Sequence, residues 1–273
     1  RRILRLAIPS ILAALSTPLI GIADTAMIGH LPEVAFMGAV STANLIFNAI
    51  FWCLAFLRMG TTALVAQYFG ADDRPACAGI LYRSLWLALM LGAVIVASSP
   101  WISRVGFTLA GGSAEVQYWG GQYFAIRVWE APLVLSILTL NGFFLGTANA
   151  LAPLWVTMVA NLVNIGADYV LIFGKWGAPE MGVKGAAWAS VLGNAAALAM
   201  GVLILVYRYR PYLREWPKKI WDLRPMRRLL QTNAFLFGRT LCLQLAGFFM
   251  LGMVSRMGEA QLAANAVVLQ VWG

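Results

Sequence analysis

Residues 6–30, "LAIPSILAALSTPLIGIADTAMIGH", form an apolar run that is interrupted by a single aspartate, Asp24. About 20 predominantly apolar residues are enough for a helix to cross a hydrocarbon core of about 30 Å. Basic residues precede the run, as in a secretory signal peptide, but the run is too long and lacks an obvious small-residue cleavage site. We therefore predict a transmembrane helix over residues 6–29, in which Asp24 needs a physical explanation.

The composition extends this prediction to the whole chain. Of its 273 residues, 61% are hydrophobic and 11% are charged, whereas soluble domains carry about 25% charged residues. Apolar stretches recur along the sequence and predict an all-α polytopic membrane protein. The further helices are expected at residues 35–66, 79–104, 119–147, 153–174, 185–207 and 233–255, and an eighth begins near residue 260.

A weak internal repeat suggests how these helices are organised. An offset of 226 residues aligns "RRIL" at 1–4 with "RRLL" at 227–230 and Gly21 with Gly247. Six helices followed by a restart in the same orientation predict two parallel bundles. The chain opens on Arg1 and stops at Gly273 inside a predicted helix, so we expect a longer protein whose C-terminal bundle is incomplete here. The predicted regions are a first six-helix bundle at 1–207, a cytoplasmic interfacial linker at 208–232, and helix seven with the start of helix eight at 233–273.

The basic residues predict the orientation. With the N-terminus inside, thirteen Lys and Arg residues fall in inner segments and four in outer segments, which satisfies the positive-inside rule. Topology thus accounts for the net charge of +9, and nucleic acid is not an expected partner. We expect a multi-pass protein of the inner (plasma) membrane, with a cytoplasmic N-terminus and the lipid bilayer as its surroundings.

Several classes of site are disfavoured. The three cysteines include no CxxC pair, so neither a disulfide framework nor a zinc knuckle is indicated. One histidine cannot form an HExxH metal site, and no GxSxG serine elbow is present. We predict neither enzymatic activity nor an organic cofactor.

Two acids lie deep in the apolar spans. Ionisable groups inside a membrane are costly, so each is a hypothesis about function. Asp24 precedes His30 by six residues and Asp168 precedes Lys175 by seven, which places both acids about 9 to 10 Å below the outer boundary at 1.5 Å per residue. Acids on two different helices are therefore expected at one level.

Neutral polar residues are expected at the same level. Asn161, Asn164 and Asp168 follow the spacing i, i+3, i+7, which is one face of a helix. Ser190 lies six residues past Lys184, or about 9 Å deep, and Asn194 lies one turn further inward. These groups predict a pocket for a coupling proton, because buried carboxylates can exchange protons near neutral pH.

Other interpretations stay open. The oxygens of Asp24, Asp168 and Asn164 also suit a hard cation such as Na⁺, and polar groups between membrane helices often serve as packing contacts. On the second predicted helix, Ser41, Asn44 and Asn48 are cavity lining or interhelical hydrogen bonders. Arg127 and Glu130, at i and i+3, are expected to form an ion pair. Pro9 and Pro18 are expected to kink helix one.

Six segments carry a family resemblance, in order and over essentially the whole chain: "GIADTAMIGHL", "FLRMGTTALVAQYFGA", "FLGTANALAPLW", "NLVNIGADYVLIFG", "GVKGAAWAS" and "LAANAVVL". They resemble the multidrug and toxic compound extrusion (MATE) family, DinF-like branch. The resemblance implies twelve helices in two bundles and antiport of a lipophilic, often cationic compound against protons or sodium.

The resemblance also implies roles for individual residues. The helix-one acid of the family matches Asp24, its Asn-xxx-Asp motif on helix five matches Asn164 and Asp168, and its kink proline matches Pro9. Its helix-six hydroxyl matches Ser190, where threonine is more usual, and Glu130 departs from the small or neutral residue expected there. Two rival functions are a lipid-linked saccharide flippase of the same superfamily and a non-transporting membrane scaffold.

Overall fold

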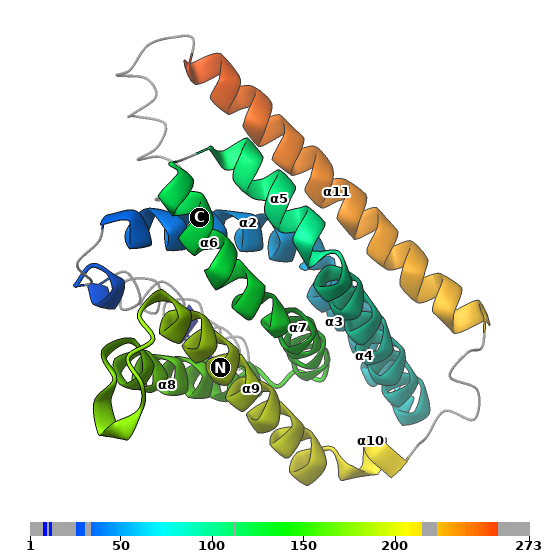
Figure 1. The fold of residues 1–273 in the computed structure, drawn as a ribbon. Helices are drawn as coiled ribbons and strands as arrows, with labels where there is room; N and C mark the ends of the chain where they lie inside the picture. Colours follow the sequence, from blue (N-terminus) through cyan, green and yellow to red (C-terminus); the bar gives the residue numbers. More distant parts are fainter. Residues whose placement is uncertain are drawn as a thin grey trace.

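The computed structural model describes residues 8–9, 11–12, 26–30, 34–111, 113–214 and 223–255, and the regular structure of these residues is helical (Figure 1). Five segments among them are long and apolar enough to cross a membrane. They are Ala35–Gly70, Arg74–Ala97, Ala114–Gly146, Leu151–Phe173 and Val183–Arg208. This agrees with the prediction of an all-α polytopic protein.

The first of these segments contains two helices instead of the one predicted over 35–66. Helix α2 spans Val34–Leu54 and α3 spans Phe56–Gly70. At the junction, the Ala55 N–H donates to the Trp52 carbonyl at 3.2 Å, which is the i to i−3 pattern of a tighter turn. The chain therefore passes from α2 to α3 without a loop, and its backbone hydrogen bonding tightens at Ala55.

The helix predicted over 79–104 is also two helices, α4 at Arg74–Ala97 and α5 at Ser99–Ala110. Helix α4 begins early because the Asp73 side chain accepts a hydrogen bond from the Ala76 N–H at 3.0 Å and caps the first turn. The division falls at Ser98, two residues before Pro100. A proline ring has no N–H and disfavours a continuous helix before it, and the sequence prediction overlooked this signal.

The helix predicted over 119–147 is likewise interrupted. Helix α6 spans Ala114–Arg127, a single 3-10 turn η1 spans Val128–Glu130, and α7 spans Ala131–Gly146. Ser113 caps α6 by accepting from the Val116 N–H at 3.3 Å, and Pro132 lies in the first turn of α7. The proline again explains the interruption, which places Glu130 at the change of geometry.

The next helices follow the prediction closely, and the last does not. Helix α8 spans Leu151–Phe173 and α9 spans Val183–Arg208, within two residues of the predicted ends, with the short η2 at Lys175–Gly177 between them. After α10 at Arg210–Arg214, α11 spans Leu223–Ser255 and so begins ten residues before the predicted residue 233. The added turns, "LRPMRRLLQT", are rich in good helix formers. Helix α11 is not among the five apolar spans.

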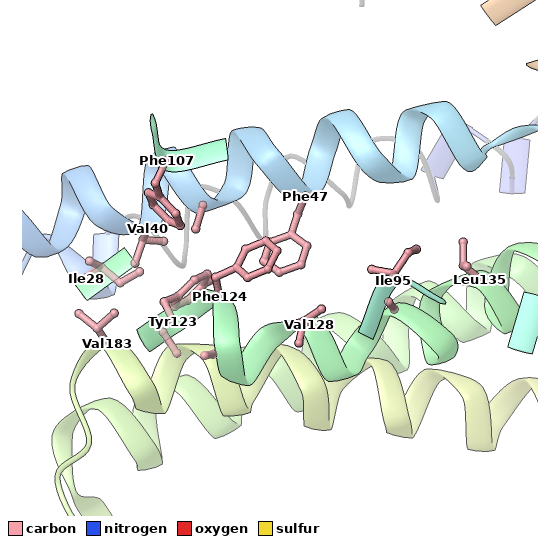
Figure 2. Packing of buried hydrophobic residues seen from close by; sticks show 14 of the residues in the cluster. Ile28, Val40, Phe47, Ile95, Phe107, Tyr123, Phe124, Val128, Leu135 and Val183 are labelled. Carbon is pink, nitrogen blue, oxygen red and sulfur yellow. The ribbon is translucent and has the colours of Figure 1, made fainter. Parts of the chain in front are cut away.

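Two apolar clusters hold the helices together. In the first, Phe47 of α2 stacks on Phe124 of α6 with ring centroids 4.6 Å apart, and Phe107 of α5 meets Phe124 edge-on at 6.5 Å (Figure 2). The second joins α3, α4, α7 and α8 to Tyr209 and to Leu229 of α11. Aromatic pairs in these geometries add to the stabilisation from burial. Together the clusters fix α6 and α9 beside the polar groups described next.

Candidate functional site

The polar face of α8 is buried inside the protein. Asn161, Asn164 and Asp168 are 9%, 5% and 1% exposed. A helix in a membrane could turn these residues toward lipid only at a high cost, because lipid offers no hydrogen bonds. The spacing i, i+3, i+7 therefore does what the sequence indicates: it gathers three polar side chains on one protein-facing side of the helix.

Helix α9 covers this face at very short range, and two glycines allow it. A Cβ atom on Gly193 would lie 2.9 Å from the Asn164 Cβ and 3.0 Å from the Ala160 carbonyl oxygen. A Cβ atom on Gly185 would lie 2.6 Å from the carbonyl oxygen of Leu171. Small residues let membrane helices approach closely and exclude lipid from the contact. We call this contact the α8–α9 seam.

The two glycines also define the register of the seam. Helices α8 and α9 are consecutive and antiparallel, with Gly193 opposite Asn164 and Gly185 opposite Leu171 (Figure 1). Ser190 lies between the two glycines along α9, so its level falls between those of Asn164 and Leu171. Asp168 lies in the same interval on α8. Ser190 is 7% exposed, and the seam therefore brings the predicted residues Asn164, Asp168 and Ser190 to one level.

The seam offers oxygen atoms to a cation. Among the described residues, the amide oxygen of Asn164 accepts no hydrogen bond in its buried position. Buried acceptors usually find a donor, so a buried oxygen without one is suited to bind a proton donor or a cation. The carboxylate of Asp168 supplies the negative charge. The described residues contain no cluster of three His, Cys, Asp or Glu side chains suited to a metal ion.

A charged network lies against the seam beside Asn194. The Asn194 amide of α9 donates to Glu130 Oε2 at 3.1 Å, and Arg127 Nε donates to Glu130 Oε1 at 2.9 Å. Arg127 also donates to the Tyr123 hydroxyl at 2.8 Å and to the Asn44 amide oxygen of α2. The predicted pairing of Arg127 with Glu130 is confirmed. The network connects α2, α6, η1 and α9.

The polar face predicted on α2 does not line one cavity. Asn44 contacts Arg127, whereas Ser41 and Asn48 are exposed. Ser41 lines a hollow of about 490 Å³ between α2 and the start of α6, near Ser113. Asn48 lines another of about 280 Å³ together with Gln244 of α11. The three residues therefore face different surroundings, because successive turns of α2 meet different helices.

Parts of the predicted site lie outside the described residues. Asp24 and Pro18 are not among them, so their proposed positions stay predictions. Pro9 is described and is buried within a helical stretch. Ile28, four residues after Asp24, packs into the first apolar cluster beside Val183, the first residue of α9 (Figure 2). The described end of this segment thus lies near the start of α9.

Comparison with known proteins decides the family. The MatE family model matches residues 9–170, which is more than half of the chain. The chain belongs to the MatE family. It is 36% identical to DNA damage-inducible protein F of Escherichia coli (strain K12) over 266 residues, covering 97% of this chain and 57% of that protein. It is 29% identical to the probable multidrug resistance protein NorM of Thermotoga maritima over 79% of this chain and 46% of that one.

Solved structures agree on the fold. A MATE crystal structure in the bent conformation matches this MatE chain with a TM-score of 0.85 at 23% identity, covering 99% of this chain and 60% of that one. A MOP superfamily transporter from Pyrococcus furiosus matches with a TM-score of 0.83 at 22% identity. The chain therefore spans about 60% of these structures and about half of the related sequences. It is a multi-pass membrane protein of a transporter family, not an enzyme.

Two contacts of this MatE chain could not be predicted from local spacing. The hydrogen bonds from Asn194 to Glu130 and from Arg127 to Asn44 join residues 64 and 83 positions apart. Depth counting places Asn194 one turn inward of Ser190, but it cannot say that Glu130 on another helix reaches it. The unusual charge of Glu130 within an apolar span was the one sequence signal for this network.

Proposed function

We propose that this chain is the first bundle of a secondary active transporter, which exports lipophilic or cationic compounds in exchange for protons or sodium. The observation that carries the proposal is the α8–α9 seam, where Asp168 is buried beside Asn164 and Ser190. A carboxylate inside a membrane is costly. A coupling cation that binds and leaves would give this cost a function.

The names of relatives support multidrug export as the transport activity. Proteins called NorM and a multidrug resistance protein, PmpM, of Pseudomonas aeruginosa match 70% to 98% of this chain. The chain covers about half of each, so we propose that a second bundle completes the substrate pathway. The transported compound would then lie between two bundles, with helix α11 as the first helix of the second.

The proposed mechanism couples charge at the seam to the shape of helix one. Asp24, on the predicted helix one, would complete the pocket formed by Asp168, Asn164 and Ser190. Binding of a proton or Na⁺ would neutralise the carboxylates and let helix one bend at Pro9 or Pro18, which would expel the substrate outward. A ligand shifts an equilibrium only by its differential affinity for the two states, so the two shapes of the transporter must bind the cation with different affinities. Release of the cation inward would then reset the pocket.

The orientation follows the distribution of basic residues. We propose that the N-terminus is cytoplasmic and that the protein resides in the inner (plasma) membrane. The inner ends of α9 and α10 then present Arg208, Arg210 and Arg214, all exposed, to the cytoplasmic surface. The outer surface would receive the η2 turn and the start of α9.

Two alternative functions are less well supported. A lipid-linked saccharide flippase needs cationic groups for an anionic substrate, but Arg127 is paired with Glu130, and Arg58 and Arg239 are exposed away from the seam. A non-transporting scaffold has no use for a buried carboxylate beside an amide oxygen that accepts no hydrogen bond from the residues that the structure describes. Multidrug antiport uses both groups.

Efflux of a fluorescent cationic dye tests the proposal. The full-length transporter that contains this chain would be reconstituted in vesicles, with either a proton or a sodium gradient imposed. We expect Asp168→Asn and Asp24→Asn to reduce gradient-driven efflux at least about 100-fold, because loss of a coupling group removes the driving reaction itself.

The matched control is Asp72→Asn, which makes the same change at an acid that is exposed on the loop between α3 and α4. It should transport like the unmodified protein. The gradient that drives efflux identifies the coupling cation. Undiminished efflux in both variants would return Asp24 and Asp168 to a packing role. An absence of dye transport by the unmodified protein under either gradient would favour the scaffold.

A further inference from the structure

Glu130 lies at an interruption that the surrounding helices hold in place. It ends the 3-10 turn η1 between α6 and α7 and is 1% exposed. Helix α4 packs tightly against the next residues, since a Cβ atom on Gly92 would lie 2.5 Å from the Cα of Pro132. The backbone near Glu130 therefore has little room to move, and its carboxylate has a defined position inside the bundle.

The two oxygens of this carboxylate have different partners. Oε1 accepts from Arg127 Nε at 2.9 Å, and Oε2 accepts from Asn194 Nδ2 at 3.1 Å. Arg127 is held in turn by the Tyr123 hydroxyl, by Asn44, and by the ring of Phe47, whose centroid is 5.1 Å from the guanidinium carbon. The ion pair is thus neutral overall and fixed from α2 and α6, while one carboxylate oxygen faces α9.

Asn194 transmits this fixed position to the seam. Its amide donates both to Glu130 and to the backbone carbonyl of Ser190, one turn earlier on α9, at 3.1 Å. Its neighbour Gly193 is the residue that lets α9 approach Asn164. The turn from Ser190 to Asn194 therefore contacts η1 through one side and α8 through the other.

We propose that Glu130 is a positioning residue for the α8–α9 seam: through Asn194 it sets the rotation and depth of Ser190 against Asn164 and Asp168, and so tunes the affinity for the coupling cation. A hydrogen bond to an ionised acceptor is stronger than one between neutral groups. A carboxylate therefore orients Asn194 better than the small or neutral residue expected at this position could. This inference rests on the proposed function of the seam.

The first test removes Asn194 and leaves the ion pair intact. In the full-length transporter, Asn194→Ala should weaken the apparent affinity for the coupling cation about tenfold, the size of effect found when an outer-shell partner of a binding site is lost. The maximal rate of dye efflux at saturating cation should stay within about twofold of the unmodified protein, because Asp168, Asn164 and Ser190 remain. A structural role alone would lower the amount of folded protein and the maximal rate, but not this affinity.

The second test asks whether Glu130 acts through Asn194. Glu130→Gln alone should weaken the cation affinity by a similar factor, and the variant with both changes should be no weaker than either one, since both remove one connection. Glu130→Gln leaves Arg127 without its counter-charge, and this variant could fail to fold. In that case Asn194→Ala alone tests the inference. Leu192→Ala, on the exposed face of α9, is the control for truncation of this helix.

The outcomes separate this inference from the proposed function. Loss of efflux in Asp168→Asn together with an unchanged cation affinity in Asn194→Ala would overturn the positioning role and leave the proposed function standing. Unchanged efflux in Asp168→Asn would refute the proposed function itself. Additive losses in Asn194→Ala and Glu130→Gln would show that Glu130 acts by another route and would also overturn the inference.

Discussion

Two contacts between helices in this protein pair a glycine with an asparagine, but they differ in the residues beside that pair. In the α8–α9 seam, Gly193 faces Asn164; in the α3–α11 contact, Gly60 faces Asn233, whose amide would overlap any added Cβ. Asn164 and Asn233 are both buried, at 5% and 3% exposure. The first seam carries Asp168 one turn further along, whereas the second carries Thr61 and Leu236. A glycine opposite an asparagine thus gives close approach, and the added carboxylate distinguishes the candidate ion pocket.

The α3–α11 contact is also tied at its end in a different way. Arg228 of α11 donates to the Gln67 amide oxygen at 2.9 Å and to the Tyr68 hydroxyl at 3.3 Å. Both partners are neutral, Gln67 is exposed and Tyr68 is partly buried, and we propose that the two helices belong to different bundles. Exposed polar contacts stabilise little, so this contact contrasts with the buried polar groups of the α8–α9 seam.

Placing a carboxylate in the second seam should have the largest effect on stability. Asn233→Asp would bury a negative charge beside Thr61 and Leu236, and we expect the free energy of unfolding to fall by roughly 3 kcal/mol. Denaturant unfolding in detergent measures it. Asn233→Leu, of similar volume and without charge, should be close to neutral, and equal losses in both variants would mean that the amide, not the missing carboxylate, defines this contact.

The two glycines should differ when each is changed to alanine. Gly193→Ala meets the Asn164 Cβ and a backbone carbonyl, which cannot turn away, so we expect a loss of roughly 1 to 3 kcal/mol. Gly60→Ala meets the end of the Asn233 side chain, which can rotate, and alanine gains roughly 1 kcal/mol of helix propensity over glycine. In thermal unfolding, the melting temperature of Gly193→Ala should therefore be well below that of Gly60→Ala. The reverse ranking would show that the α3–α11 contact is the more tightly packed.

The smallest effect is expected at the end of α11. Arg228→Ala should cost less than about 1 kcal/mol, because its contacts with Gln67 and Tyr68 are exposed. Arg227→Ala, at an exposed neighbouring position, provides the baseline for removing one arginine from this turn. The melting temperatures of the two variants should be nearly equal to each other, at low salt and at high salt. A large loss confined to Arg228→Ala would make this contact a main attachment between the bundles.

The sequence predicts the groups of the seam better than it predicts the helices around it. The spacing of Asn161, Asn164 and Asp168 requires one buried face, and depth counting places Ser190 at their level. The interruptions at Ser98 and η1 were missed, although Pro100 and Pro132 signal them, because proline is also tolerated inside membrane helices. Contacts such as Asn194 with Glu130 depend on how distant helices pack, and local spacing carries no information on that.

Tyr209 anchors the chain at the point where it leaves α9. Its hydroxyl meets the Thr147 hydroxyl at 2.9 Å and accepts from the Asn149 amide at 3.1 Å, while its ring packs on Phe143 and Phe144. The chain therefore leaves the first bundle from an anchored point at the end of α9. A pull on the chain after α9 would load the loop between α7 and α8 through Tyr209, and it would load α4 through the hydrogen bond from the Tyr82 hydroxyl to the Leu213 carbonyl at 3.2 Å.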